Sequence, residues 1–365
     1  MHAASMVELS NGDLRGVWFS GSREGAGDVT VQTAVMDIAT GRWGLESTVI
    51  DRMQLQRGLQ RYVKKLGNPV IGRAADGSLL LWMVNVSLGG WAGSSISWVR
   101  SVDEGVTWSR PRRLVTSPFL NISTLPKGGS VRMTDGQIAL PVYHEFLTKF
   151  SELLLLDEHV KVVDKVRIPG SQTSLQPVVM VSSAQRAQAY MRSGTASSVM
   201  TSTTKDAGKS WSVNQPTAWP NPDSAVAGVA LDNGTQWLAL NPGHRQREQL
   251  ALIQTRLGGS FDGQVLWRVE GSASQERRLS RSQYENLLVQ ELTASGANPA
   301  QVQAYVASAM RQLCDDQECA QEYSYPFLLK GSDGSLHMIY TWHRTRIKHI
   351  RLDPWQPVFT LAASP

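Results

Sequence analysis

Apolar runs rich in β-branched residues recur in pairs along this chain, and a short polar turn separates the two members of each pair. Around Ser182-Ser183 the turn lacks a glycine. The other five turns each contain a dipeptide that favours a tight hairpin, namely Asn11-Gly12, Asp76-Gly77, Asp135-Gly136, Asn233-Gly234 and Asp333-Gly334. The spacing of roughly 45 to 65 residues between units is typical of four-stranded propeller blades. The pattern therefore predicts an all-β fold, a six-bladed β-propeller in which residues 1–365 form one domain.

One segment, residues 280–321, breaks the strand pattern before the last blade. Its first half, residues 282–293, repeats apolar side chains at helical spacing, among them Tyr284 and Leu288. Its second half opens with Asn298-Pro299, a helix N-cap followed by a first-turn proline. We expect an inserted helical hairpin that either covers the mouth of the central channel as a lid or forms a surface for a partner.

Charge and composition narrow the range of partners. The 365-residue chain has a net charge of +5 at pH 7, and no run of lysines and arginines suggests nucleic acid. No apolar run approaches the roughly 20 residues that span a bilayer. The chain opens in a strand-like run, Ser5–Leu9, without a leader, and we expect a secreted or periplasmic protein whose export signal has been removed. Cys314 and Cys319 fit a disulfide and free thiols equally well, and a metal site is not expected.

Two eight-residue stretches share a turn motif. Ser101–Trp108 and Thr204–Trp211 each place a hydroxyl residue two positions before an aspartate, a glycine two positions after it and a tryptophan five positions after it. The aspartate accepts backbone hydrogen bonds in such a turn, and the glycine supplies a positive φ. This is the Asp-box, a structural turn on the outer rim of a propeller blade. It marks the repeats rather than the chemistry.

With two Asp-boxes in six repeated units, the chain resembles members of the sialidase (neuraminidase) superfamily. The resemblance extends along the chain through four further segments, which are Gly67-Asn68-Pro69-Val70, Pro126-Lys127-Gly128-Gly129, Glu322-Tyr323-Ser324-Tyr325-Pro326 and Tyr340–His349. The last two look like the bacterial predicted-neuraminidase branch. The resemblance implies an exo-glycosidase with an aspartic acid as acid/base, a tyrosine nucleophile polarised by a glutamate, and three arginines that bind the substrate carboxylate.

Carried over by matching motifs, the resemblance assigns three catalytic candidates. Asp28 follows the first hairpin and is the expected acid/base, with Arg23 as a cation that faces the substrate. Tyr323 opens the last blade and is the expected nucleophile. Asp223 stands where the family has the glutamate that polarises the tyrosine, although its side chain is one methylene shorter. A tyrosine suits this position because a carboxylate nucleophile would be repelled by the carboxylate on the anomeric carbon.

The expected carboxylate site departs from the family pattern. His2 stands where the family begins with an arginine, so a planar bidentate donor is lost. Arg245 or Arg247 lies near the central arginine of the family. The third arginine falls in the helical insert, where four candidates remain open, namely Arg277, Arg278, Arg281 and Arg311. The remaining side chains expected to line the funnel and bind substrate are Glu24, Asn68, Gln176, Arg192, Asn241, Tyr325 and Arg344.

The leading interpretation is a sialidase-like, retaining exo-glycosidase that removes a terminal acidic sugar from a glycan without a cofactor. The competing interpretation is a non-catalytic glycan-binding propeller with a decayed site. A polysaccharide lyase that uses tyrosine and histidine is a third class, which no feature of the sequence favours. Because His2 replaces an arginine, we expect common sialosides to be poor substrates and another acidic or modified sugar to be the ligand.

Overall fold

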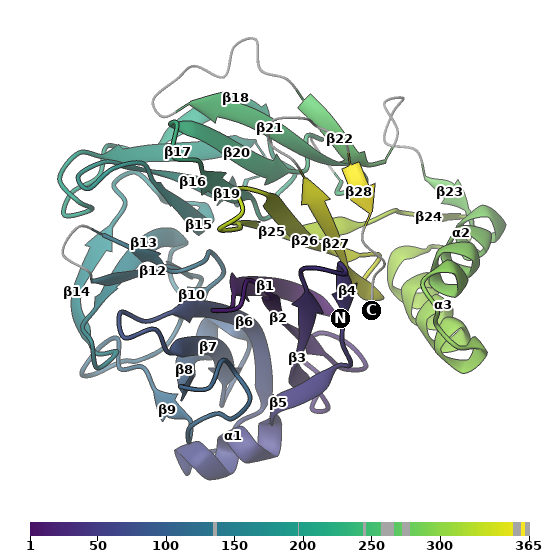
Figure 1. The fold of residues 1–365 in the computed structure, drawn as a ribbon, viewed down its shortest axis with the longest axis horizontal. Helices are drawn as coiled ribbons and strands as arrows, with labels where there is room; N and C mark the ends of the chain where they lie inside the picture. The colour runs from purple at the N-terminus through teal and green to yellow at the C-terminus, as the bar shows by residue number, and fades with distance from the viewer. Residues whose placement is uncertain are drawn as a thin grey trace.

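Six antiparallel sheets surround a common centre in the computed structural model (Figure 1), which describes residues 1–133, 137–195, 197–243, 246–256, 266–271, 278–352 and 359–361. Each sheet is one blade of a β-propeller, so the predicted all-β, six-bladed fold is confirmed. Four blades have four strands in sequential order, and blades 1 and 3 each carry an additional short strand. The innermost strand of each blade lies nearest the centre, where side chains of neighbouring blades meet.

The strand boundaries follow the repeated units of the sequence. Blades 1 and 2 consist of β1 (His2–Glu8), β2 (Leu14–Ser20), β3 (Thr30–Asp37), β4 (Arg42–Trp43), β5 (Ser47–Asp51), β6 (Lys65–Arg73), β7 (Leu79–Val86), β8 (Ser94–Ser101) and β9 (Arg112–Arg113). Blades 3 and 4 consist of β10 (Leu125–Pro126), β11 (Val131–Arg132), β12 (Ile138–His144), β13 (Phe150–Leu156), β14 (Val162–Arg167), β15 (Ser174–Val181), β16 (Ala187–Ser193), β17 (Ser198–Thr204) and β18 (Gln215–Pro220). Blades 5 and 6 consist of β19 (Ala227–Ala230), β20 (Thr235–Leu240), β21 (Leu250–Arg256), β22 (Leu266–Glu270), β25 (Tyr323–Lys330), β26 (Leu336–Trp342), β27 (Arg346–Leu352) and β28 (Phe359–Leu361).

Side-chain packing between blades 1 and 6 closes the ring, because each of these blades is built from its own end of the chain. Strand β1 lies between β6 and β25. The Ala3 N–H donates to Thr341 Oγ1 at 3.3 Å, and the Ser332 N–H donates to the carboxylate of Glu8 at 3.0 Å. Apolar side chains from the two blades form one buried cluster that includes Met6 and Phe327.

The Asp-boxes form tight turns between the third and fourth strands of blades 2 and 4. In the first box, Asp103 accepts from Ser101 Oγ at 2.7 Å and from the Thr107 N–H at 2.9 Å, and Gly105 has a φ of 87°. These hydrogen bonds lower the pKa of Asp103 to about 2. The second box repeats the same bonds with Thr204, Asp206, Gly208 and Ser210. Both glycines lie against the preceding blade, where a Cβ atom would collide with Arg15 or Met133.

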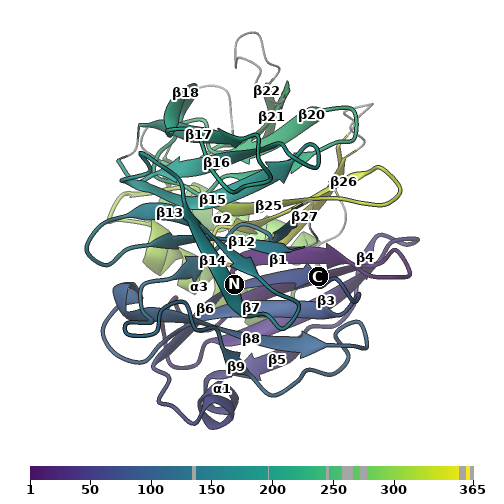
Figure 2. The same ribbon diagram turned by 90° about the vertical axis from the view of Figure 1, so that its left-hand side faces the viewer.

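Three helices accompany the blades. Helix α1 (Arg52–Leu59) lies beside β5 and β9 at the outer edge of blades 1 and 2 in both views (Figures 1 and 2). The short strands β23 (Leu279–Ser280) and β24 (Glu318–Cys319) pair at the base of helices α2 (Arg281–Ala294) and α3 (Pro299–Leu313), which come before the last blade. The predicted helical insertion before the last blade is therefore confirmed.

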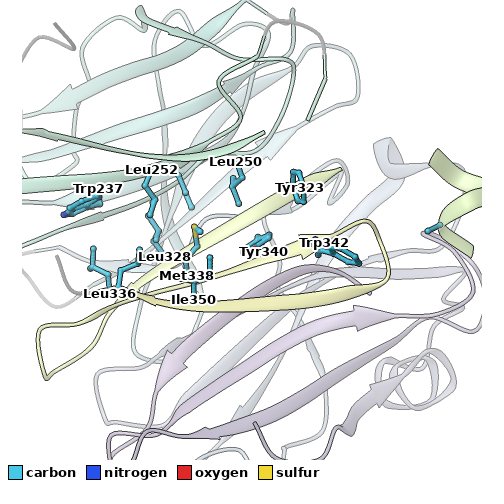
Figure 3. Packing of buried hydrophobic residues seen from close by; sticks show 14 of the residues in the cluster. Trp237, Leu250, Leu252, Tyr323, Leu328, Leu336, Met338, Tyr340, Trp342 and Ile350 are labelled. Carbon is cyan, nitrogen blue, oxygen red and sulfur yellow. The ribbon is translucent and has the colours of Figure 1, made fainter. Parts of the chain in front are cut away.

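The helical insertion packs against blade 6. Tyr284, Leu288 and Leu292 of α2 are fully buried in the same apolar cluster as Tyr340 and Trp342, part of which appears in Figure 3. A disulfide joins Cys314 to Cys319 and ties the end of α3 to β24. Among the described residues, no helix is both long and apolar enough to cross a membrane.

Candidate active site

The innermost strands share a backbone irregularity near their first residues. Ala3, Asn68, Gln176 and Tyr325 lie where the pairing register of β1, β6, β15 and β25 shifts, and their φ values are 50°, 43°, 53° and 51°. Asp223, with a φ of 56°, has the same left-handed backbone just before β19. A bulge of this kind redirects a side chain that regular alternation would place on the other face of the sheet.

Polar side chains of all six blades gather around these bulges, and we call this group the funnel. Blades 1 to 3 contribute His2, Glu24, Asn68, Lys127, Tyr143 and Glu145. Blades 4 to 6 contribute Gln176, Arg192, Asp223, Arg247, Glu322, Tyr325 and Arg344. Beyond the bulges, the inner strands enclose a channel with a cavity of about 300 Å³.

Tyr325 has the richest cationic environment in the funnel. Its half-buried ring meets the His2 ring edge-on, with the centroids 4.4 Å apart. Lys127 Nζ and Arg247 Cζ each lie 5.7 Å from the Tyr325 ring centroid. Two cationic groups therefore lie over the Tyr325 ring in a cation–π arrangement.

Tyr323, the expected nucleophile, lies outside the funnel. Its ring is buried in the apolar cluster between blades 5 and 6, next to Leu250 in Figure 3. Its hydroxyl donates to Gln321 Oε1 at 2.7 Å, and burial raises its pKa. Tyr323 therefore belongs to the interblade packing, whereas Tyr325 faces the funnel.

The β2–β3 loop carries three of the expected residues, and it separates them. Asp28, the expected acid/base, is exposed and accepts from the N–H of Ser22 at 2.9 Å and from its Oγ at 3.0 Å, as a turn-capping aspartate does. Arg23 is also exposed, at the edge of the funnel. Glu24 approaches the funnel instead, and its Oε2 lies 4.0 Å from His2 Nε2. The Glu24 side chain is itself 38% exposed, and partial burial of its carboxyl group raises its pKa above the usual value.

His2 is a neutral group in this position. It is 6% exposed, and burial, followed by the charges of Arg344, the N-terminus and Arg247, lowers its pKa well below the usual value. Its Nδ1 is buried without a hydrogen-bond partner among the described residues. His2 therefore occupies the position of a family arginine without carrying that arginine's charge at pH 7.

Two arginines meet at one buried carboxylate. Glu322 Oε2 accepts from Arg344 Nε at 2.9 Å, and its Oε1 lies 3.9 Å from an Arg247 terminal nitrogen. Arg247 also donates to the carbonyl oxygen of Asp223 at 2.9 Å. Both guanidinium groups remain partly exposed, at 21% for Arg247 and 32% for Arg344. They can therefore donate hydrogen bonds to both oxygens of a bound carboxylate while Glu322 keeps them in place.

A chain of hydrogen bonds crosses blades 2 to 5 on the opposite wall. Asp223 Oδ1 accepts from Arg192 Nε at 2.6 Å, and Arg192 donates to Gln176 Oε1 at 3.1 Å. Gln176 and Asn68 each donate to the Tyr143 hydroxyl at 3.4 Å. Burial opposes the charge of Arg192, but the bond to Asp223 and the nearby Tyr325 raise its pKa overall. The carboxylate of Asp223 is thus engaged by Arg192.

Sequence reasoning missed two ionisable groups of the funnel as site residues. Lys127 is buried, and its Nζ donates to the carbonyl oxygen of Pro326 at 3.4 Å. Burial lowers its pKa to about 8. Burial also raises the pKa of Glu145, which lies near Arg192 and Lys149. The Pro126-Lys127-Gly128-Gly129 segment was identified only as a blade opening, although it interrupts an inner strand at the level of the bulges.

The remaining expected residues lie outside the funnel or outside the described residues. Asn241 is buried and donates to the carbonyl oxygens of Gln249 at 2.6 Å and Tyr323 at 2.8 Å, so it links blades 5 and 6. Two of the four candidates for the third arginine, Arg278 and Arg281, bind Asp315 within the insert. Arg245 and Arg277 are outside the described residues, and Arg311 is exposed on α3. In the part of the chain that is described, no cluster of three or more histidine, cysteine, aspartate or glutamate side chains is arranged to hold a metal ion.

Sequence comparison identifies one family. Residues 12–338 match the family described as BNR repeat-like domain. No curated protein sequence matches the chain.

Solved structures of several proteins share the fold. An intramolecular trans-sialidase from Ruminococcus gnavus aligns over 100% of this chain and 96% of its own, with a TM-score of 0.67 and 12% identity. A protein of unknown function from Dyadobacter fermentans aligns over 93% of this chain and 90% of its own, with a TM-score of 0.67 and 10% identity. The NanB sialidase of Streptococcus pneumoniae aligns over 93% of this chain and 65% of its own, with a TM-score of 0.65 and 9% identity. The chain spans between 56% and 65% of several sialidase structures that it matches. At these identities the likeness establishes the fold.

Proposed function

The chain belongs to the BNR repeat-like domain family, and from this premise we propose that it is a sialidase-like glycoside hydrolase that removes a terminal acidic sugar from a glycan with retention of configuration. The observation that carries the proposal is the position of Tyr325, half-buried at the centre of the funnel and surrounded by cationic side chains. A glycan-binding surface has no need of a phenol in this electrostatic environment, whereas a tyrosine nucleophile does.

Tyr325, rather than Tyr323, is the nucleophile in this proposal. Its hydroxyl group releases its proton to solvent as the phenolic oxygen attacks the anomeric carbon of the acidic sugar. The bond to the leaving group breaks, and a glycosyl–tyrosine intermediate forms. Lys127 Nζ and Arg247 Cζ, each 5.7 Å from the centroid of the ring, stabilise the negative charge that develops on the phenolic oxygen during attack. A neutral tyrosine also approaches a substrate carboxylate without the repulsion that an aspartate or glutamate nucleophile would meet.

Glu24, rather than Asp28, is the acid/base. Partial burial raises the pKa of its carboxyl group, which favours the protonated form that donates a proton to the leaving-group oxygen. The resulting carboxylate then accepts a proton from the water that attacks the glycosyl–tyrosine bond. Asp28 caps the loop that carries Glu24 through its bonds to Ser22, and its contribution is positional.

Arg247 and Arg344 bind the carboxylate of the acidic sugar, and Glu322 holds them in register. Asp223, which we expected to polarise the tyrosine directly, acts through Arg192 and positions its guanidinium group. The site therefore has two arginines and a neutral His2 in place of the three arginines of the family.

The proposal is tested by replacing each tyrosine with phenylalanine and measuring hydrolysis of aryl glycosides of sialic acid, uronic acids and neutral sugars. Tyr325→Phe removes the nucleophilic oxygen with little change of shape, so we expect turnover to fall at least a thousandfold while binding persists. Tyr323→Phe removes only a hydrogen bond to Gln321 and is the matched control. It is expected to retain activity within a few-fold. The reverse order of effects would refute the assignment of Tyr325.

A second candidate function is glycan binding without turnover, and the neutral His2 favours it because the carboxylate site is weaker than three arginines would make it. In that case acidic monosaccharides bind, whereas none of the aryl glycosides is hydrolysed. For location, we propose secretion or export to the periplasm. The Cys314–Cys319 disulfide supports an oxidising compartment.

A further inference from the structure

The helical insert reaches the funnel at one place, beside the proposed acid. Ser308 and Gln312 are one turn apart on α3, and both are half-buried. They line a small pocket together with Arg23, Glu24 and Arg344. The pocket has a volume of about 30 Å³, room for one water molecule or one hydroxyl group but not for a sugar ring.

Several contacts hold the helices at this place. The Tyr284 hydroxyl of α2 lies 2.8 Å from His343 Nδ1, and His343 directly precedes Arg344. Glu291 of α2 accepts from Arg346 at 2.7 Å. With the buried apolar contacts of α2, these bonds make the insert a fixed wall of the site rather than a hinged lid.

The pocket offers both kinds of hydrogen-bonding group. Gln312 Nε2 donates to the carbonyl oxygen and the Oγ of Ser308, at 3.2 Å and 3.0 Å, so its own carbonyl oxygen is left to accept from an incoming hydroxyl group. The guanidinium groups of Arg23 and Arg344 are donors. A hydroxyl group, which both donates and accepts, matches this set.

Because the pocket lies next to Glu24, its location indicates which part of the substrate would bind there. A general acid lies within hydrogen-bond reach of the oxygen that it protonates, and in a glycoside this is the oxygen of the leaving group. Groups adjacent to the acid can therefore meet the leaving group, and Arg344, which also lines the pocket, marks where this subsite borders the carboxylate site. We propose that Ser308 and Gln312 of the insert form a leaving-group subsite that binds a hydroxyl group of a second sugar. This inference rests on the proposed function and specifies its substrate as an acidic sugar linked to another sugar.

The test compares two substrates that contain the same acidic sugar. One is the methylumbelliferyl glycoside of N-acetylneuraminic acid or of glucuronic acid, whichever the wild-type protein hydrolyses faster. The other is the disaccharide in which that acidic sugar is linked to galactose. The quantity measured is the ratio of kcat/KM for the disaccharide to kcat/KM for the aryl glycoside.

Gln312→Ala and Ser308→Ala are expected to lower this ratio threefold to tenfold, the value of about one hydrogen bond. Gln303→Ala is the matched control, because Gln303 is exposed and nine residues away on the same helix, on its opposite side. It should leave the ratio and both activities unchanged. Thermal melting establishes that all three variants are folded.

An unchanged ratio in Gln312→Ala and Ser308→Ala, with both glycosides hydrolysed, would overturn the leaving-group subsite and leave the proposed function standing. A loss equal on both substrates would also overturn it, since such a loss indicates a general effect on Glu24 or Arg344. If the wild-type protein hydrolyses neither glycoside, the proposed function fails and the subsite fails with it.

Discussion

Replacing Glu322 with glutamine is expected to tighten the binding of an acidic sugar while making the protein less stable. The carboxylate of Glu322 is 9% exposed and serves two arginines. Glutamine has nearly the same volume and keeps one oxygen acceptor for Arg344 Nε, so the positions of the arginines are retained. What is lost is one negative charge beside the proposed carboxylate site.

The size of both effects, on stability and on affinity, can be estimated from the separation of the charges. Two unit charges 3.9 Å apart, the Glu322–Arg247 separation, interact by about 4 kcal/mol at an effective dielectric constant of 20. Because both arginines are partly exposed, solvent screening reduces the loss in unfolding free energy to about 2 kcal/mol. For a ligand carboxylate bound by the same two arginines, relief of the screened repulsion from Glu322 should amount to about 1 kcal/mol, or about fivefold in Kd.

The assay is calorimetric titration with glucuronic acid and N-acetylneuraminic acid, alongside thermal melting. Glu322→Ala removes both the charge and the acceptor, and it should weaken binding because Arg344 loses its partner. Glu291→Gln is the matched control, since Glu291 of α2 pairs with Arg346 and Lys348 of β27, away from the two arginines of the carboxylate site. It should lower stability without changing the affinity for the acidic sugar. If Glu322→Gln weakens binding as much as Glu322→Ala, the electrostatic reasoning is refuted and Glu322 matters only as a carboxylate.

Two further predictions concern protons. We expect Glu24→Gln to reduce hydrolysis of substrates with poor leaving groups at least a hundredfold more than hydrolysis of activated aryl glycosides, and Asp28→Asn to cause no such difference, as kcat/KM on the two substrate types will show. Burial lowers the pKa of His337 to about 4 from an unfolded value near 6.5, so the stability that the neutral ring provides is fully present above pH 6.5 and is lost as the pH falls to 4, by about 3 kcal/mol. The melting temperature should fall over this range. His337→Gln should weaken this dependence on pH without abolishing it, because burial also lowers the pKa of the neighbouring His349, to about 3.

The blades were predictable because their signals are local. A turn dipeptide such as Asp333-Gly334 and a motif such as Ser101–Trp108 each specify a few backbone conformations within the motif itself. The helices of residues 280–321 were predictable for the same reason, since Asn298 caps α3 with its own side chain as expected. Such signals depend little on the rest of the chain.

The proposed nucleophile was harder to predict because its orientation depends on a bulge. In a regular strand, residues two apart share one face, so Tyr323 and Tyr325 look equivalent. The repeats did contain a distinguishing signal, since a proline follows the bulge residue at Asn68, Gln176 and Tyr325. A strand tolerates proline at a bulge, where the ladder hydrogen bond is missing. Aligning these three X-Pro pairs would have selected Tyr325 from the sequence.

The choice between Glu24 and Asp28 was set by contacts that the sequence does not specify. Both lie in one loop of blade 1, and spacing alone favoured Asp28. The structure engages Asp28 with Ser22 and brings Glu24 toward His2, a residue 22 positions earlier. The position of Arg344 likewise depends on a turn with left-handed backbone, in which φ is 46° at His343 and 57° at Arg344. Neither residue type favours this conformation, so the sequence does not predict the turn.

The charges of the funnel connect ligand binding with catalysis. Four cations, Lys127, Arg192, Arg247 and Arg344, face four carboxyl groups, which belong to Glu24, Glu145, Asp223 and Glu322. If all eight were ionised, the group would be neutral and would attract an acidic sugar weakly. The pKa values of Glu24 and Glu145 are raised by burial, so both groups take up protons at a higher pH than a free glutamate does. The funnel then becomes positive at the same pH at which Glu24 carries the proton that the leaving group needs. Under the proposed mechanism, one protonation therefore favours both the binding of the anionic sugar and its cleavage, and the neutral His2 is compensated by the loss of negative charge rather than by a further arginine.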